Sequence, residues 1–332
     1  MTEPGLLSRL FFMYMSKNII IEESNFAKKK SKFVPLLIIS VIVIIGLTVS
    51  IFFLCKSLRK KSSNSATVSE LANKWNVYDY QSVYDLSQKI LDSNPFNNAA
   101  LTYHGYASFF LAVSQLDSAT AQNYLDEAIN SMRVALLKPK KKLIPQLNYM
   151  LGKAYFYKNT ISSYYYADLA VKYLEESRRL GYKTSDTAEY LGLSYAALEM
   201  PMESISAFTE ALLVRESDSL LLSIAEQYYK AGQANAAKQY LFRIKNDCEN
   251  EDLILKSMNL LGTIYIEEKK YAEAKEEFES ILKKNPNSAD AYYNLGVIYE
   301  KQGDLIKARA EWRKALRIQV NHSGALAKIA EF

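Results

Sequence analysis

"NLGVIYEKQGDLIKARAEWRKAL" (Asn294–Leu316) repeats, with changes, a segment that lies 34 residues earlier in the chain. The earlier segment, Leu260–Leu282, reads "LLGTIYIEEKKYAEAKEEFESIL". Both segments place a small residue after leucine, a tyrosine three residues later, a second small residue, and then a large aromatic residue. A period of this length predicts an array of similar structural units rather than one irregular core.

Six copies of this pattern can be aligned between residues 98 and 322. The last four copies keep 12 residues between their two small residues, whereas the first two copies have 23 and 18. We expect the extra residues to lengthen a turn or the helix ends beside it. The first small residues are Gly105, Gly152, Gly192, Ala225, Gly262 and Gly296, and the second ones are Ala128, Ala170, Ser204, Ala237, Ala274 and Ala308.

Each copy has the periodicity of two helices, because its apolar residues recur at intervals of three and four. Small residues at fixed points allow two helices to approach closely. A large residue follows each second small residue by four positions and therefore shares its helix face. We expect these large residues to fill the gap between consecutive pairs, and the pairs to stack because one pair cannot bury its own apolar face. They are Met132, Leu174, Phe208, Leu241, Phe278 and Trp312.

The period and the residue types resemble the tetratricopeptide repeat (TPR) family. The last copy matches its pattern with Tyr292, Leu295, Gly296, Tyr299, Ala308, Trp312 and Ala315, although Val320 stands where a proline is usual. The resemblance implies an all-α fold, a right-handed superhelix of stacked antiparallel helix pairs. The predicted array covers 68–322, with a degenerate first repeat marked by "YDLSQKILDSNPFN" before the six others, and 323–332 form a C-terminal cap.

A membrane segment is predicted before the array. Residues 33–54 read "FVPLLIISVIVIIGLTVSIFFL", without a charge, and basic residues flank them on both sides. A helix of this length spans roughly 33 Å, close to the thickness of the hydrocarbon core. A cleaved signal peptide would have a shorter apolar region, and a buried core helix would rarely be apolar on every face. We therefore expect a basic tail at 1–32, a transmembrane helix at 33–54 and a polar linker at 55–67.

The net charge of +5 is unevenly distributed. Residues 1–61 carry a net charge of +7, whereas residues 62–332 hold 31 basic and 33 acidic residues. The positive excess beside the membrane segment suits anionic lipid head groups, and the array lacks the basic excess that nucleic-acid binding needs. A slight excess of lysine and arginine before the span predicts a cytoplasmic N-terminus, with the array on the opposite side of the membrane.

The sequence offers no convincing catalytic or cofactor motif. It contains no Gly-x-Gly, so dinucleotide-binding and kinase-type loops are not expected. "GLSYA" (Gly192–Ala196) lacks the strand-to-helix setting of a serine nucleophile, and the two histidines and two cysteines have no metal-ligand spacing. We therefore expect neither an enzyme nor a cofactor or metal site.

The resemblance implies a concave face lined by the first helix of each pair, and aromatic residues gather at its positions. Tyrosine is favoured at interfaces because it joins a large contact area to a polar group, and Lys153 is placed to pair with an acidic partner residue. The alternative is that these large residues fill a wide gap between helices. The candidate partner-binding residues are Tyr106, Phe109, Tyr149, Lys153, Phe156, Tyr157, Tyr229 and Tyr293.

The predicted function is a membrane-anchored scaffold that binds a helix or peptide of a partner protein in this groove. The alternative function is a structural subunit of a membrane-associated assembly that uses the array ends and the convex face. The C-terminal cap is short, so the apolar edge of the last repeat is expected to be partly open to a partner or to self-association.

Overall fold

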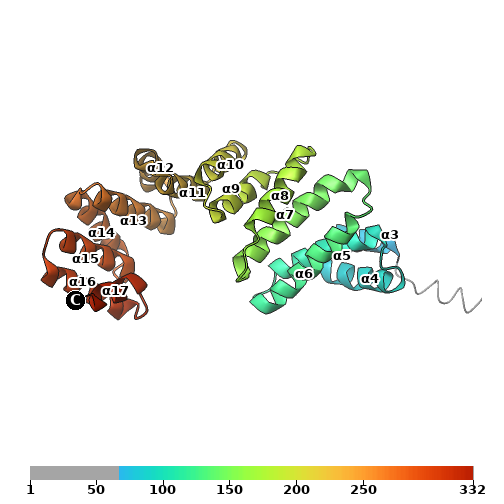
Figure 1. Ribbon diagram of the computed structural model, residues 1–332, viewed down its shortest axis with the longest axis horizontal. Helices are drawn as coiled ribbons and strands as arrows, with labels where there is room; N and C mark the ends of the chain where they lie inside the picture. The colour runs from blue at the N-terminus through green and yellow to red at the C-terminus, as the bar shows by residue number, and fades with distance from the viewer. Residues whose placement is uncertain (1–66, 332) are drawn as a thin grey trace, which may run out of the picture. The chain divides into compact units, whose positions relative to one another are not determined.

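The structure is a computed structural model that describes residues 67–331, which are all-helical (Figure 1). The all-α prediction is therefore confirmed for this part of the chain. The basic tail, the expected transmembrane helix at 33–54 and nearly all of the linker lie outside the described residues. Among residues 67–331, no helix combines the length and the apolar character that crossing a membrane requires.

The helices of residues 67–331 pack as seven successive pairs followed by one further helix, with η1 (Lys141–Leu143) as a short 3-10 turn. Neighbouring pairs also contact each other, so the units stack along the chain (Figure 1). The pairs are α3 (Val68–Asn76) with α4 (Tyr80–Ser93), α5 (Asn98–Val113) with α6 (Ser118–Ala135), α7 (Ile144–Ile161) with α8 (Ala167–Arg179), α9 (Thr187–Ala197) with α10 (Pro201–Val214), α11 (Asp218–Lys230) with α12 (Ala234–Asp247), α13 (Glu251–Glu267) with α14 (Tyr271–Lys284), and α15 (Ala289–Lys301) with α16 (Leu305–Ile318), before α17 (Ser323–Ala330).

Tight turns join the two helices of the five pairs without insertions. Each turn has three residues, and the middle one adopts a left-handed backbone conformation with φ between 57° and 85°. Glycine enters this region without strain, and other residues do so less readily. The middle residues are Tyr78, Glu199, Gly232, Lys269 and Gly303.

Close helix contacts occur at the conserved spacing of small and large residues, but within each pair. A Cβ atom on Gly296 would lie 2.3 Å from Nε1 of Trp312, and one on Gly152 would lie 2.5 Å from Cγ of Leu174. The same residues also pack toward the following unit, since Phe278 clusters with Leu295 and Trp312 with Ala325, so the expected filling between consecutive pairs accompanies the contact within each pair. The large side chain of the second helix lies over the small residue of its own first helix, because the two antiparallel axes come closest there.

The second and third pairs, which carry the insertions, have long helices and long turns. Helices α5, α6 and α7 have 16, 18 and 18 residues, whereas α9 and α10 have 11 and 14. Helix α8 has 13 residues, and α13, in a pair without an insertion, has 17. The turns at 114–117 and 162–166 are also longer than three residues. Both expected locations of the extra residues are thus used, and the added helical turns extend the face formed by the first helices.

Candidate protein-binding face

In the N-terminal part of the array (α3–α10), the first helix α7 contacts the first helices α5 and α9 of the neighbouring pairs. Three of the candidate residues, Tyr106, Phe109 and Tyr149, are buried there in the largest apolar cluster. The ring of Tyr106 lies 5.8 Å from that of Trp75, between centroids, and the ring of Phe109 lies 5.6 Å from that of Tyr157. These three side chains belong to the core, as the alternative interpretation of the aromatic residues expected, and present almost no surface to a partner.

A polar network closes this face next to Tyr149. Its hydroxyl donates to both carboxylate oxygens of Asp186, at 2.7 and 2.8 Å. The ammonium of Lys153 donates to Oδ2 of Asp186 at 3.0 Å and to the Tyr149 hydroxyl at 3.1 Å. It also lies 4.6 Å from the ring centroid of Tyr190, within cation–π range. The acidic partner expected for Lys153 is therefore an aspartate of the same chain, 33 residues downstream.

The network keeps Asp186 ionised. Burial raises the pKa of its carboxyl group, but the hydrogen bonds from Tyr149 and Lys153 and the charge of Lys153 outweigh burial and lower the pKa below its ordinary value. Burial and the bond to Asp186 raise the pKa of Tyr149 in turn. At neutral pH the site therefore holds a neutral phenol between an ammonium and a carboxylate, an arrangement that fixes α7 against the start of α9.

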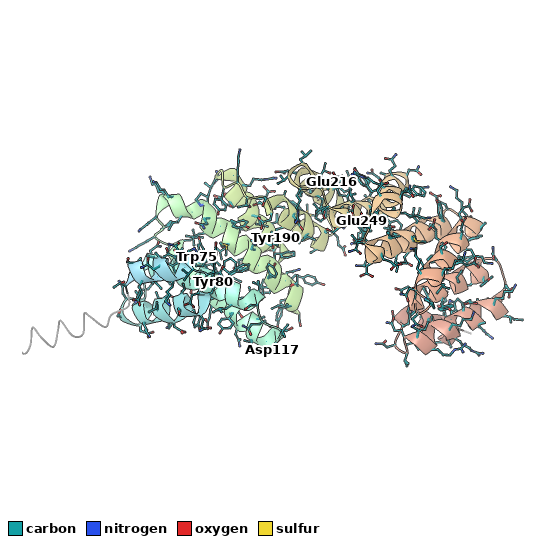
Figure 2. All side chains as sticks on the ribbon, turned by 180° about the vertical axis from the view of Figure 1, so that it is seen from behind. Trp75, Tyr80, Asp117, Tyr190, Glu216 and Glu249 are labelled. Carbon is teal, nitrogen blue, oxygen red and sulfur yellow. The ribbon has the colours of Figure 1, made fainter. Side chains whose placement is uncertain are left out.

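Two further candidates, Phe156 and Tyr157, are half-buried beside Tyr190 of α9. The Phe156 and Tyr190 rings meet edge-on, with centroids 5.1 Å apart, and the hydroxyls of Tyr157 and Tyr190 share a hydrogen bond at 3.1 Å. Figure 2 marks Tyr190 and, at the first pair, Trp75 and Tyr80, whose ring centroids are 5.4 Å apart. Aromatic contacts thus continue along the first helices, and partner contact by Phe156 and Tyr157 stays a prediction.

The remaining two candidates lie in the C-terminal part. Tyr229 at the end of α11 is half-buried and donates its hydroxyl proton to Glu267 of α13, and burial with this bond raises the pKa of Tyr229 to about 12. Tyr293 of α15 packs beneath the last helix, since its ring lies 5.0 Å from that of His322 and a Cβ on Gly324 would lie 2.8 Å from its Cζ. Tyr293 is thus largely covered by the cap, and a role of Tyr229 in binding stays a prediction.

A hollow of about 410 Å³ opens on the first-helix face of the C-terminal part. It is formed by α11, α13, the end of α14 and the start of α15, and its side chains are charged, amide-bearing and aliphatic. Within it, Nδ2 of Asn294 donates to Oδ1 of Asn259 at 3.3 Å, which links α15 to α13. The lining residues are Glu226, Leu255, Lys256, Asn259, Leu260, Ile281, Asn285, Ser288 and Asp290. We call this region the α11–α15 groove.

The sequence analysis missed this groove because it selected aromatic residues. Glu226, Lys256 and Asn259 occupy repeat positions 9, 2 and 5, counted with the first small residue as position 8. The TPR resemblance assigns these positions to the concave face, so the same rule applied to polar residues would have found them. Asp186 and Tyr190 were also missed, and the only signal for them is their place at the start of α9, beside α7.

No group of three or more histidine, cysteine, aspartate or glutamate side chains within residues 67–331 has an arrangement that could hold a metal ion. The free thiol of Cys248 is buried after α12.

Comparisons with known proteins agree with a helical repeat. The family model described as "Tetratricopeptide repeat protein 21 C-terminal ARM domain" matches residues 173–327. The chain is 36% identical over 106 residues to the uncharacterized protein ycf37 of Pyropia yezoensis, covering 31% of this chain and 58% of that protein. It is 27% identical over 199 residues to the TPR repeat-containing protein MJ1428 of Methanocaldococcus jannaschii, covering 59% and 32%. The chain thus spans less than two thirds of either relative.

A solved structure shows the same fold. The C-terminal part of a TPR repeat-containing protein from Cytophaga hutchinsonii aligns with a TM-score of 0.56 at 12% identity, covering 79% of this chain and 99% of that one. The protein carries a TPR- or ARM-like helical repeat. Such repeats are generally non-enzymatic scaffolds whose stacked helices bind other proteins.

Proposed function

We propose that this protein is a membrane-anchored repeat scaffold that binds a helix or peptide of a partner protein in the α11–α15 groove. The hollow of about 410 Å³ on the first-helix face is the observation that carries the proposal. The corresponding face of α5, α7 and α9 is occupied by the protein's own aromatic side chains and by the pair of Lys153 with Asp186. A partner segment therefore has more accessible surface at α11, α13 and α15.

The chemistry of the groove favours a polar partner segment. Glu226 and Asp290 supply negative charge and Lys256 supplies positive charge, over a floor that includes Leu255 and Leu260. Mixed charges select a partner by complementarity and set its orientation, while the aliphatic floor accommodates one or two apolar side chains. The amides of Asn259 and Asn285 offer further hydrogen-bond groups for a peptide.

A pair of matched variants tests the groove. Lys256→Glu reverses a charge inside the groove, and Lys283→Glu makes the same charge reversal at an exposed site outside it. We expect the first variant to reduce recovery of a cross-linked partner from membranes by about tenfold or more, the scale for truncating or reversing an interfacial charge. Equal recovery of the same partner with both variants would exclude this groove.

The membrane anchor at 33–54 is supported by its length, its lack of charge and its basic flanks. We place the N-terminus in the cytoplasm and the array on the opposite side, on the basis of the slight excess of lysine and arginine in the tail. Resistance of the chain to alkaline extraction from membranes tests the anchor. Reporter fusions after Lys61 and after Phe332 test the topology, and cytoplasmic activity of both reporters would overturn it.

A second candidate function, a structural subunit of a membrane-associated assembly, is favoured by one observation. The last pair and α17 expose the apolar side chains of Ile306, Val320 and Leu326, and exposed apolar groups at the end of a repeat array are suited to joining another chain or a second copy. If Ile306→Glu with Val320→Glu reduces the size of the native assembly while partner capture persists, this second function gains support over groove binding.

A further inference from the structure

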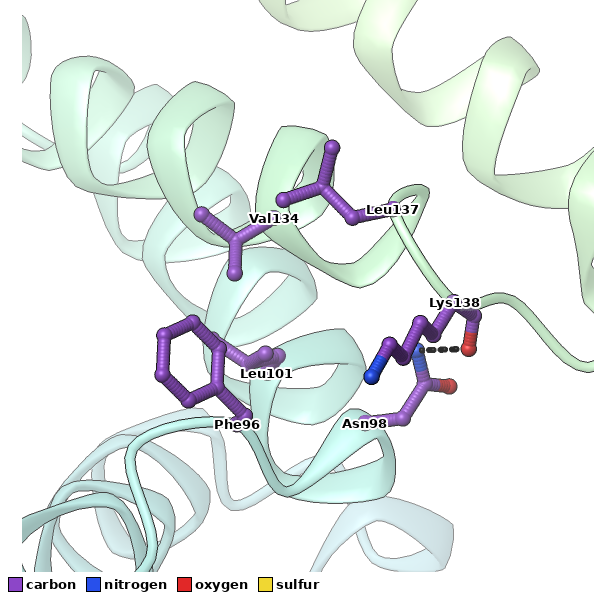
Figure 3. A pocket seen from close by; sticks show the side chains of 6 residues that line it. All are labelled: Phe96, Asn98, Leu101, Val134, Leu137 and Lys138. Carbon is purple, nitrogen blue, oxygen red and sulfur yellow. Dashed lines mark hydrogen bonds between the residues drawn. The ribbon is translucent and has the colours of Figure 1, made fainter.

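A second hollow, of about 250 Å³, lies between the start of α5 and the end of α6 (Figure 3). Two of its apolar side chains are largely open to solvent, since Phe96 is 77% exposed and Leu137 is 73% exposed. Figure 3 shows the side chain of Lys138 running across the hollow toward Leu101 and Phe96. The full lining is Phe96, Asn98, Leu101, Val134, Leu137 and Lys138.

The backbone around this hollow is held firmly. Nδ2 of Asn98 donates to the carbonyl of Ala135 at 2.7 Å and to that of Lys138 at 3.1 Å, so the end of α6 is fastened to the first turn of α5. The side chain of Asn97 caps α5 by accepting from the amide of Ala100. The exposed apolar groups are therefore presented from a fixed scaffold, which lowers the entropy lost when they bind a surface.

A concentrated positive charge adjoins the hollow. Lys138, Lys140, Lys141 and Lys142 lie within five residues, all are exposed, and none forms an ion pair with another residue of 67–331. Lysines elsewhere in the array, such as Lys238 and Lys328, are paired with glutamates.

The comparable loops farther along the array differ in charge. Loops 215–217, 248–250 and 285–288 together hold one basic and two acidic residues. Figure 2 marks the two acidic ones, Glu216 and Glu249. The run of unpaired lysines beside exposed apolar groups is therefore absent from these three loops.

This hollow lies on the edge of the array at which α3 begins. Trp75, near the end of α3, packs against Tyr106 and Phe110 in the second half of α5, with ring centroids 5.8 Å apart in both cases. The starts of α3 and α5 therefore point to the same edge, and Phe96 directly precedes α5. The predicted span ends at Leu54, so 13 residues (55–67) precede α3, and an extended chain of that length reaches at most about 45 Å. The edge is thus within reach of the bilayer surface.

We propose that Phe96, Leu137, Lys138 and Lys140–Lys142 form a patch that docks on an anionic membrane surface. Phe96 and Leu137 enter the head-group region, and the lysine ammonium groups lie against lipid phosphates. The proposal rests on the membrane anchor of the proposed function, because the anchor supplies the effective concentration that a small patch needs. It requires acidic lipids in the leaflet that the array faces. Docking at this edge holds the N-terminal pairs at the bilayer and leaves the α11–α15 groove open to a partner.

The test uses the full chain reconstituted in vesicles with or without phosphatidylserine. A nitroxide is attached at Leu137→Cys, in a background of Cys55→Ser and Cys248→Ala, and a control label is attached at Glu216→Cys. We expect the label at 137 to gain exposure to oxygen and lose exposure to a water-soluble nickel chelate only when phosphatidylserine is present. The label at 216 should stay accessible to the nickel chelate in both vesicles.

Charge variants test whether docking depends on the lysines of the patch or only on the net charge of the chain. Glutamine at positions 138, 140, 141 and 142 should lower the ratio of docked to undocked chain by about 100-fold or more, since each lysine near an anionic surface contributes a factor of about five to that ratio. Glutamine at the exposed lysines 230, 269, 283 and 301 removes the same charge and should leave docking unchanged. A label at 137 that stays aqueous in both vesicles, as it would if the patch bound only an acidic peptide, overturns the proposal.

Alkaline extraction distinguishes failure of the anchor from failure of the patch. If the chain is released, the anchor is absent, and the labelled chain is then tethered to preformed vesicles through an N-terminal histidine tag and a chelating lipid, which supplies the effective concentration instead. Burial of the label at 137 that requires phosphatidylserine and is lost in the four-lysine variant supports the docking surface, whereas a label that stays aqueous overturns it.

Discussion

The two parts of the array share one helix-pair plan but use their first-helix faces differently. In α5, α7 and α9 that face is filled by aromatic rings and by the pair of Lys153 with Asp186, and the buried residues form one large cluster. In α11, α13 and α15 the buried residues form smaller clusters, and the face carries the α11–α15 groove.

The difference follows from the side chains that the first helices carry. Phe110 and Tyr157, five residues after Gly105 and Gly152, meet rings of the neighbouring pair. The equivalent positions of α11, α13 and α15 hold Lys230, Glu267 and Lys301. Helix length does not decide the difference, because α13 has 17 residues and still lines the groove. Aromatic residues at one recurring position can thus convert a binding face into core.

Removing aromatic side chains from the first-helix face of the N-terminal part should produce the largest loss of stability. Changing Tyr149, Phe156 and Tyr157 together to alanine removes one buried and two half-buried rings, and we expect a loss of at least about 5 kcal/mol of unfolding free energy, given about 3–5 kcal/mol for a fully buried aromatic residue. Tyr164→Ala with Tyr165→Ala, at exposed positions, is the control. Circular dichroism melting measures both, and normal melting with lost partner capture would instead make this face a binding groove.

Disrupting the close helix contact in the sixth pair, α13 with α14, should give the next largest loss of stability. Ala274 of α14 is completely buried, so Ala274→Arg should overpack the pair or bury a charge and cost about 3 kcal/mol or more. Ala272→Arg, at an exposed site of the same helix, should cost little. Hydrogen exchange should show protection lost mainly in α11–α16, because each pair contacts only its neighbours. Uniform loss across the array would argue that the two parts unfold as one unit.

The ion pair of Lys153 with Asp186 on the N-terminal first-helix face contributes less to stability. Asp186→Asn leaves the ammonium of Lys153, whose side chain is only 15% exposed, without its carboxylate. We expect a cost of about 1–3 kcal/mol, below that of breaking a fully buried ion pair because Asp186 is itself one-third exposed. The double change Asp186→Asn with Lys153→Met should recover part of this loss in chemical denaturation. No recovery would show that Asp186 acts mainly through Tyr149.

The smallest expected effect is a pH dependence of stability that comes from His104 and is confined to the helices around it. The buried ring of His104 accepts or donates at Nδ1 with Ser87 and stacks on Tyr84. Burial lowers the pKa of His104 below 6.5, more strongly than Glu127, at 3.7 Å, raises it.

Below pH 6.5 the imidazole of His104 binds a proton more tightly in the unfolded chain than in the folded chain, because its pKa is lower in the folded chain. The contribution of His104 to stability is therefore complete above pH 6.5. It is lost as pH falls from there toward the folded-state pKa. Denaturant midpoints at pH 7.5 and 5.5 should therefore differ more in the wild type than in His104→Gln. An equal pH dependence in both proteins would exclude this group, and α13–α16 should respond less than α4–α6.

The sequence by itself determined the repeat, the all-helical fold and the place of each helix pair. The reason is that these features depend on short spacings, such as Gly296 with Tyr299 or Ala274 with Phe278, and a stacked array is built almost entirely from contacts between adjacent units. The 22-residue apolar segment is equally visible from sequence, and its role as an anchor stays a prediction.

Only the tertiary structure decided which large residues face solvent. Tyr106, Tyr149 and Lys153 occupy positions that the resemblance assigns to a groove, but Trp75 and Asp186 come from neighbouring pairs 31 to 37 residues away and cover or pair with them. The repeat pattern fixes the direction in which a side chain points from its own helix. Whether that direction meets water or another ring depends on the side chains of the neighbouring helices.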